Sequence, residues 1–355
     1  MSYFKNFTKE ASAPGLPNFD ISKPYFQKIR EGDIGLELEM EASNSFPWAE
    51  LGDTPCPVTN AKWQAKEDHS LRNGVEYVLS KPCDISSVRL LLEGLYKDIS
   101  DFKTKLRLSN RCSTHVHLNF TGQKLDKITN FIVLWGLFEK VLIDWWGEKR
   151  KTNHFCLSIE DSPATVEEWE KFLRGRGWNV YDGMKYSALN LLRMRDLGSI
   201  EIRCGDATED IERLVAWAEL LWSMREFSVK SVNDPSFLPS IVSDESPAGL
   251  FVSLLHPLTG NKEKYFGELF EDEDAFNRKC YSGLRDVLHL CHGIPWGDWR
   301  ETLDKVYIPN PFEKQTKSSR LDPVFPNEIP PQPPLVARNG RNFHMEVLAN
   351  RAIRV

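Results

Sequence analysis

The sequence predicts an α+β fold in which helices cover an antiparallel sheet. Short segments that alternate apolar and polar residues are typical of strands with one buried face, and they carry most of the acidic and histidine motifs. Longer segments with apolar residues at helical spacing fill the intervals between them, and such a mixture is typical of the α+β class. Hydrophobic residues make up 41% of the 355 residues, which suffices for a core and excludes a wholly disordered chain.

The first half of the chain holds three of the predicted strands. Residues 1–30 form an irregular lead-in, after which IGLELEM at 34–40 alternates with period two. VEYVL at 75–79 is the second strand, and apolar residues at helical spacing between 88 and 99 predict the helix that follows it. THVHLNF at 114–120 alternates again and gives the third strand.

The next part of the chain predicts two helices around a hairpin. Residues 128–147 are too apolar for a surface helix, so we expect them to pass through the core. Residues 189–192 and 199–204 bracket a turn at Asp196-Leu197-Gly198, which indicates a β-hairpin. Residues 209–232 then have the pattern of one long helix.

These elements suggest a division of the chain after the lead-in. Residues 31–235 contain all the predicted strands and form one domain, and residues 236–310 form a mostly helical extension. The proline-rich residues 311–355 predict an extended tail, which could contact a second copy of the chain or another protein.

Composition and charge exclude several functional classes. The net charge of −6 argues against binding to nucleic acid or to an anionic membrane. No apolar run approaches the ~20 residues that a membrane helix needs, and the first residues lack the order of a secretory signal peptide. Seven scattered cysteines without a CxxC pair favour reduced thiols, so we expect a cytoplasmic protein.

Four short motifs place ionisable residues where they could act together. Glu37 and Glu39 lie on one face of the first strand, and the side-by-side carboxylates repel each other unless a positive group lies between them. His115 and His117 share a face at a spacing that suits metal ligands. Considered alone, each pair has an ordinary alternative, which is a solvated strand face or packed histidines.

The other two motifs contain an acid near a turn and an acid paired with an arginine. Asp68 and Glu76 lie on either side of the turn-prone residues 72–74, so a hairpin could bring them together, although a plain turn is the alternative. Glu201 and Arg203 share one strand face, and an exposed ion pair there would contribute under ~1 kcal/mol.

Taken together, the motifs predict a metal-binding face. An exposed sheet does not need so many acids without interleaved lysines, whereas a concave sheet face that holds divalent cations does. Carboxylate oxygens suit Mg²⁺ or Mn²⁺, histidine can complete the set of ligands, and arginine can hold phosphate charge. The sequence therefore predicts a two-metal site for phosphoryl transfer. Its residues are Glu37, Glu39, Asp68, Glu76, His115, His117, Glu201 and Arg203.

The order of these motifs, E-x-E, D-x7-E, HVH and E-x-R, resembles the glutamine synthetase-like superfamily of ATP-dependent carboxylate–amine ligases. The chain is most similar to its amidoligase branch, which is akin to the glutamate–cysteine ligases. The matching segments are GLELEME (35–41), WQAKEDHSL with GVEYVLSKP (63–82), CSTHVHLNF (112–120), KYSALNL (185–191) and SIEIRCGDAT (199–208). The resemblance spans residues 31–235 and implies a glutamine synthetase-like catalytic domain there.

The resemblance also implies a role for each matching residue. Glu39, Asp68 and Glu76 would hold one metal, and Glu37, His115 and Glu201 the metal nearer the ATP phosphates. The catalytic residues would be Arg203, Glu76 and His117. His117 would lie beside the nucleotide phosphate and the substrate, and Arg203 would neutralise the transferring phosphoryl group. Further candidates for contact with ATP phosphate or a substrate carboxylate are Lys66, Arg111 and Arg193.

The implied activity is that of an ATP-dependent carbon–nitrogen ligase. A substrate carboxylate would attack ATP to form an acyl phosphate, and an amine would displace phosphate to form an amide or isopeptide bond. The carboxylate donor and the amine acceptor could be small molecules, peptides or macromolecules. The acyl phosphate must be kept from water, and the long polar segment 156–184 is the candidate lid.

Two other functions remain open. One is a catalytically inactive structural or binding protein on the same fold. The other is a zinc-dependent hydrolase that uses the HVH motif, with a further ligand from HLCHG at 289–293.

Overall fold

The computed structural model describes residues 29–42, 63–66, 68–72, 74–101, 106–162, 185–231, 246–260 and 262–291. The predicted tail, most of the lead-in and residues 163–184 of the candidate lid lie outside these ranges. Among the residues described, no helix combines the length and the apolar character that crossing a bilayer requires.

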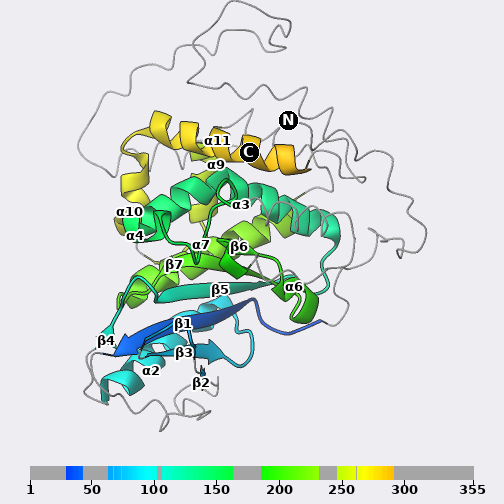
Figure 1. Ribbon diagram of the computed structural model, residues 1–355. Helices are drawn as coiled ribbons and strands as arrows, with labels where there is room; N and C mark the ends of the chain where they lie inside the picture. The colour runs from blue at the N-terminus through cyan, green and yellow to red at the C-terminus, as the bar shows by residue number, and fades with distance from the viewer. Residues whose placement is uncertain are drawn as a thin grey trace, which may run out of the picture.

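A seven-stranded antiparallel sheet forms the base of the fold (Figure 1). Its strands are β1 (Ile34–Ala42), β2 (Trp63–Lys66), β3 (Gly74–Leu79), β4 (Leu106–Arg107), β5 (Ser113–Asn119), β6 (Leu189–Asn190) and β7 (Ser199–Asp206). The order is β2-β3-β1-β5-β7-β6, and β4 pairs with the end of β1. The predicted α+β fold with an antiparallel sheet covered by helices is therefore confirmed.

Helices cover the sheet in layers (Figure 1). They are α2 (Val88–Asp101), α3 (Leu125–Trp146), α4 (Glu148–Lys151), α6 (Arg193–Asp196), α7 (Ile211–Lys230), α9 (Pro247–Leu255), α10 (Lys262–Phe266) and α11 (Glu273–Cys291), with 3₁₀ turns η1 (Ile85–Ser87) and η3 (Gly267–Phe270). Helix α7 contacts β5 and α3 contacts β7, while α11 packs on the far side of α3. A Cβ atom at Gly283 of α11 would lie 2.1 Å from the Gly136 carbonyl oxygen, so these two helices approach each other at their glycines.

The two faces of the sheet differ because the strand residues alternate. On β1, Ile34, Leu36, Leu38 and Met40 are buried and belong to the hydrophobic core. The residues that alternate with them include Glu37, Glu39 and Glu41, which point to the opposite face. The helices therefore cover an apolar face and leave the ionisable residues together on the other.

The predicted elements agree with the structure apart from their ends and one insertion. The core helix begins at Leu125, and the predicted hairpin is the pair β6–β7, although the short helix α6 lies in its connection. Helices α9 and α11, from the predicted C-terminal extension, pack on α7 and α3 and share their core. The division of the chain at residue 235 stays a prediction.

Glu139 is a buried carboxyl group within this core. It lies on α3, where Trp135 Nε1 and the Ile159 backbone N–H each donate it a hydrogen bond of 2.9 Å. Burial raises the pKa of Glu139 from 4.5 to about 7. Between these two values the folded chain holds a proton that the unfolded chain has lost, so this group lowers the free energy of unfolding as pH rises from 4.5 to 7.

We expect the Glu139→Gln variant to lose this pH dependence, because glutamine resembles the protonated acid. From pH 5 to 7.5, the free energy of unfolding of the wild type should therefore fall by up to about 3 kcal/mol more than that of the variant. Urea denaturation at a series of pH values measures this difference. Glu263→Gln, at an exposed site on α10, is the matched control and should follow the wild type. Parallel curves for the wild type and Glu139→Gln would contradict the prediction.

Candidate metal centre

The register of the sheet brings acids and histidines from four strands side by side. The opposed residues are Glu37 and His115 on β1 and β5, Glu39 and Glu76 on β1 and β3, and His117 and Glu201 on β5 and β7. Residues directly opposite each other in antiparallel strands have Cβ atoms about 5 Å apart. The ionisable side chains therefore converge on the face that the helices leave uncovered.

The first cluster consists of Glu39, Asp68 and Glu76, whose ligand atoms all lie within 4.8 Å of one another. Asp68 comes from the turn before β3, where the backbone N–H of Ser70 donates a 2.7 Å hydrogen bond to Asp68 Oδ1. The Ser113 hydroxyl donates a hydrogen bond to Glu39. These are the three residues that the resemblance assigns to the first metal.

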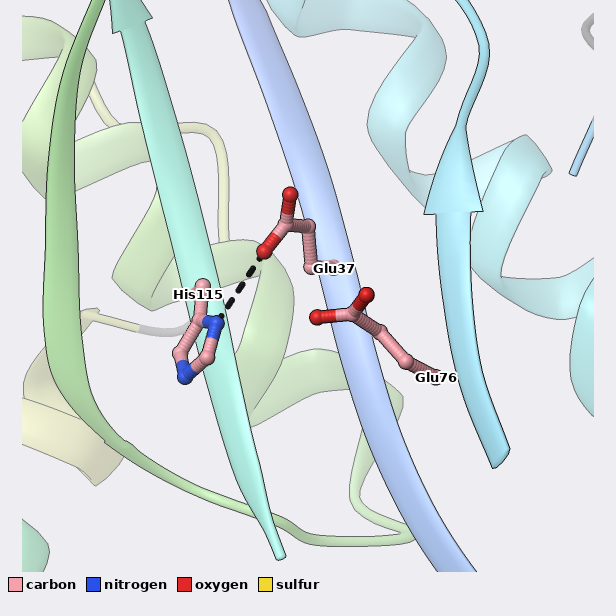
Figure 2. Close-up of side chains that lie close together, drawn as sticks. All are labelled: Glu37, Glu76 and His115. Carbon is pink, nitrogen blue, oxygen red and sulfur yellow. Dashed lines mark hydrogen bonds and ion pairs between the residues drawn. The ribbon is translucent and has the colours of Figure 1, made fainter. Parts of the chain in front are cut away.

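The second cluster is built around Glu37. The His115 Nδ1 atom lies 3.1 Å from Glu37 Oε2 and 3.4 Å from Glu201 Oε1, while His117 Nε2 lies 3.1 Å from Glu37 Oε1. Figure 2 shows Glu37, Glu76 and His115 pointing toward one another from three neighbouring strands.

Both histidines therefore reach the same carboxylate. The ligand atoms of Glu37, His117 and Glu201 lie within 4.8 Å of one another, and so do those of Glu37, Glu76 and His115. The resemblance gives His115 to the second metal and His117 to phosphate, and this division of roles stays a prediction.

Burial and neighbouring charges shift the pKa values of the carboxyl groups in the two clusters in different directions. Burial, together with the charges of Glu37 and Glu39, raises the pKa of Glu76 to about 9. Burial also raises the pKa of Glu39. Burial acts in the same direction on Glu37, but the charges of His117 and His115 and their hydrogen bonds hold its pKa well below the usual value.

The balance of charges on this face indicates whether its residues suit a bound cation. The face holds more carboxylates than its imidazoles and arginines neutralise, so Glu76 must take up a proton unless another positive charge is present. A divalent cation supplies that charge, and carboxylate oxygens with one or two imidazoles are a ligand set that Mg²⁺ or Mn²⁺ accepts. The residues of both clusters therefore fit divalent cations.

Arg203 lies at the edge of the second cluster. Its Nη1 donates to Glu201, which is 1% exposed, and Asn190 Nδ2 donates a 2.7 Å hydrogen bond to the other oxygen of Glu201. The Arg203 Nε–H is buried and has no partner among the residues described. Burial alone would raise the pKa of Glu201, but the charges of Arg203 and His117 lower it below the usual value.

A β-bulge sets the direction of Arg203. The register between β5 and β7 shifts between Thr114 and Val116, so Arg203 and Cys204 lie opposite the single residue His115. Arg150 of α4 is buried behind the bulge and donates to the carbonyl oxygens of Cys204 at 3.1 Å and Arg203 at 2.8 Å. Its guanidinium group thus fixes the backbone from which Arg203 projects.

The structure places the remaining candidates at the margin of the site. Arg193 on α6 is half exposed, with Nε 3.9 Å from Glu201 Oε2. Lys66 lies opposite Glu76 in the pairing of β2 with β3, but it is exposed and forms no ion pair with a described residue. Arg111 Nη1 donates a 2.7 Å hydrogen bond to the Ser70 carbonyl oxygen.

Sequence reasoning missed three residues that hold the site together: Ser113, Asn190 and Arg150. Ser113 is two residues before His115, so the same alternation that identified the histidines could have identified it. Asn190 lies within the matching segment KYSALNL, but the resemblance gave it no role, and Arg150 acts across the bulge, where no periodic pattern marks it. The side chains of HLCHG at 289–293, the predicted source of a further zinc ligand, lie outside those that the structure describes.

Comparison with known proteins adds no assignment. No protein-family model matches the chain, and no curated protein matches it. What the chain does is therefore inferred from its residues and their geometry.

Proposed function

We propose that this chain is an ATP-dependent carboxylate–amine ligase of the glutamine synthetase-like, amidoligase kind. The observation that carries the proposal is the convergence of acids and histidines from β1, β3, β5 and β7 on one uncovered sheet face, next to the partly buried Arg203. Such an antiparallel sheet with a carboxylate-rich face is also what the motif order leads us to expect of that superfamily.

Two sets of residues would hold divalent cations. Glu39, Asp68 and Glu76 form one set, and Glu37 and Glu201 form the other with one of the two histidines. When bound, Mg²⁺ or Mn²⁺ would neutralise the oxygens of the ATP phosphates.

The remaining side chains of the site would orient the substrates and stabilise charge. In the proposed reaction the acid's carboxylate attacks the γ-phosphorus of ATP, ADP leaves, and an amine then displaces phosphate from the acyl phosphate. Arg203 has a buried N–H without a partner among the residues that the structure describes, which suits an oxygen of the transferring phosphoryl group. His117 is positioned by the Ser199 hydroxyl, 3.3 Å from its Nδ1, and its other nitrogen faces the same space as Glu37.

The donor set supports this proposal over the zinc hydrolase. Zinc sites in proteins are built mainly from cysteine and histidine, whereas five of the seven candidate ligands here are carboxylates. An inactive binding protein on the same fold would have no need to keep so many mutually repelling acids on one face.

ATP turnover in the presence of Mg²⁺, against a panel of carboxylic acids and amines, tests the proposal. We expect ADP and phosphate to be released only when a suitable acid is present, and hydroxylamine to trap the activated acid as a hydroxamate. If calorimetry detects binding of neither ATP nor Mg²⁺, the chain is a structural or binding protein. Hydrolysis supported by Zn²⁺ without ATP would favour the zinc enzyme.

A further inference from the structure

One serine hydroxyl lies between the two metal clusters. Leu38 of β1 is opposite Thr114 of β5. The neighbouring pair, Glu39 and Ser113, therefore lies side by side on the face that carries the ionisable residues. Ser113 Oγ donates a hydrogen bond to Glu39 Oε2 and lies 2.7 Å from Nε2 of His115, the next residue of β5 on that face. Ser113 thus contacts one proposed ligand of each cation.

The directions of these two hydrogen bonds depend on each other. A serine hydroxyl has one hydrogen, and Ser113 donates it to Glu39. The hydrogen between Ser113 and His115 must then come from Nε2 of the imidazole. The two bonds form one chain that runs from His115 through Ser113 to Glu39, and we call it the serine bridge.

The serine bridge leaves the other ring nitrogen of His115 facing the second cluster. Nδ1 lies 3.1 Å from Glu37 Oε2 and 3.4 Å from Glu201 Oε1. A neutral imidazole with its hydrogen at Nε2 has a lone pair at Nδ1, and this lone pair would meet the two carboxylates. A divalent cation between them turns the repulsion into coordination, because all three groups donate electron pairs. The serine bridge therefore holds His115 in the tautomer that a cation at the second cluster requires.

The residues of the serine bridge are shielded from water. The exposed fractions of Ser113, His115 and Glu39 are 3%, 2% and 4%. A buried donor or acceptor that loses its partner in the protein leaves a hydrogen bond unmade, which costs free energy. Loss of the Ser113 hydroxyl would therefore affect His115 and Glu39 at the same time.

We propose that Ser113 couples the two cation sites. A cation that binds Nδ1 of His115 fixes the ring hydrogen at Nε2, so the Ser113 hydroxyl directs its own hydrogen to Glu39. This hydrogen bond orients the Glu39 carboxylate, which is a ligand of the first cation. The coupling is reciprocal, so a cation at either cluster favours the serine bridge that the other cluster uses. The inference rests on the two cation sites of the proposed function and is independent of ATP.

Calorimetric titration of the full-length, metal-free chain with Mn²⁺ tests the coupling. Asp68→Asn removes an anionic ligand of the first cluster that is not part of the serine bridge, so this variant gives the affinity of the second cluster with the first one empty. Comparison with the unchanged first cluster gives the factor by which the first cation favours binding of the second. We expect this factor to be about fivefold or more smaller when Ser113→Ala is present.

Two further variants separate the hydroxyl from its surroundings. Ser113→Thr keeps the hydroxyl and should retain the coupling. Ser228→Ala removes a buried hydroxyl on α7 that donates to the Arg225 carbonyl oxygen, and it should bind Mn²⁺ like the wild type.

A spectroscopic measurement tests the tautomer in the wild-type chain. NMR of the Mg²⁺-loaded chain labelled with ¹⁵N-histidine reports which ring nitrogen of His115 carries the hydrogen, and we expect it to be Nε2. The signal of His115 is identified by its absence from the spectrum of His115→Gln.

The outcomes separate this inference from the ligase proposal. If the coupling factor is the same with Ser113 and with Ser113→Ala, the inference is wrong even where the chain turns over ATP. It is also wrong if His115 carries its hydrogen on Nδ1 when Mg²⁺ is bound, or if Ser113→Ala weakens only the first cation. Coupled binding of two cations that depends on Ser113, in a chain that does not bind ATP, would support the inference and overturn the ligase proposal.

Discussion

The Glu39→Gln variant is expected to lose the stabilisation by Mg²⁺ and about a hundredfold or more of its ATP turnover. Glu39 shares the first cluster with Asp68 and Glu76, so its loss removes one of three anionic ligands. The charge of Glu39 also helps to raise the pKa of Glu76, so without metal the variant should be more stable than the wild type. Removing a metal ligand would then stabilise the metal-free protein.

Thermal unfolding with and without saturating Mg²⁺ measures both effects. The wild type should gain stability from the cation by mass action, and Glu39→Gln should gain little. Glu93→Gln, an exposed position on α2, is the matched control and should respond to Mg²⁺ like the wild type. An equal Mg²⁺ response in Glu39→Gln and the wild type would show that this cluster does not bind the cation.

The local pattern of the sequence was sufficient to predict which residues share a face. In β1 the alternation of Leu36, Glu37, Leu38 and Glu39 reflects a sheet with one apolar face, and side-chain direction follows the backbone with period two. The antiparallel sheet and its helical cover followed from such patterns. Local periodicity carries this information because it depends only on neighbouring residues.

The partners across the sheet could not be predicted in the same way. Register depends on the whole length of two strands and on the turns that join them, so the motif order could not say that His117 lies opposite Glu201. The bulge at Arg203 and Cys204 is stabilised by Arg150, more than fifty residues earlier in the chain. A contact between such distant residues leaves no periodic signal in the sequence.

The Arg203→Ala variant is expected to release phosphate from ATP about a thousandfold more slowly while it still binds Mg²⁺. The Arg203 Nε–H is buried without a described partner, and Nη1 contacts Glu201, so the guanidinium group can contact both a metal ligand and a phosphate oxygen. Alanine removes the positive charge next to Glu201 but leaves all the carboxylates of both clusters. Cation binding should therefore persist, whereas stabilisation of the transferring group is lost.

Comparison with a lysine variant separates loss of charge from loss of geometry. Arg203→Lys keeps one positive charge but lacks the planar fork, so its turnover should lie between those of the wild type and Arg203→Ala. Both variants are assayed for phosphate release and for the shift of melting temperature by Mg²⁺. Full turnover in Arg203→Ala would exclude a role in phosphoryl transfer. If the alanine variant does not fold, the lysine variant serves as the test. Lysine cannot reproduce the planar guanidinium group that the bulge orients. Turnover of ATP by Arg203→Lys at the wild-type rate would therefore show that only the charge matters.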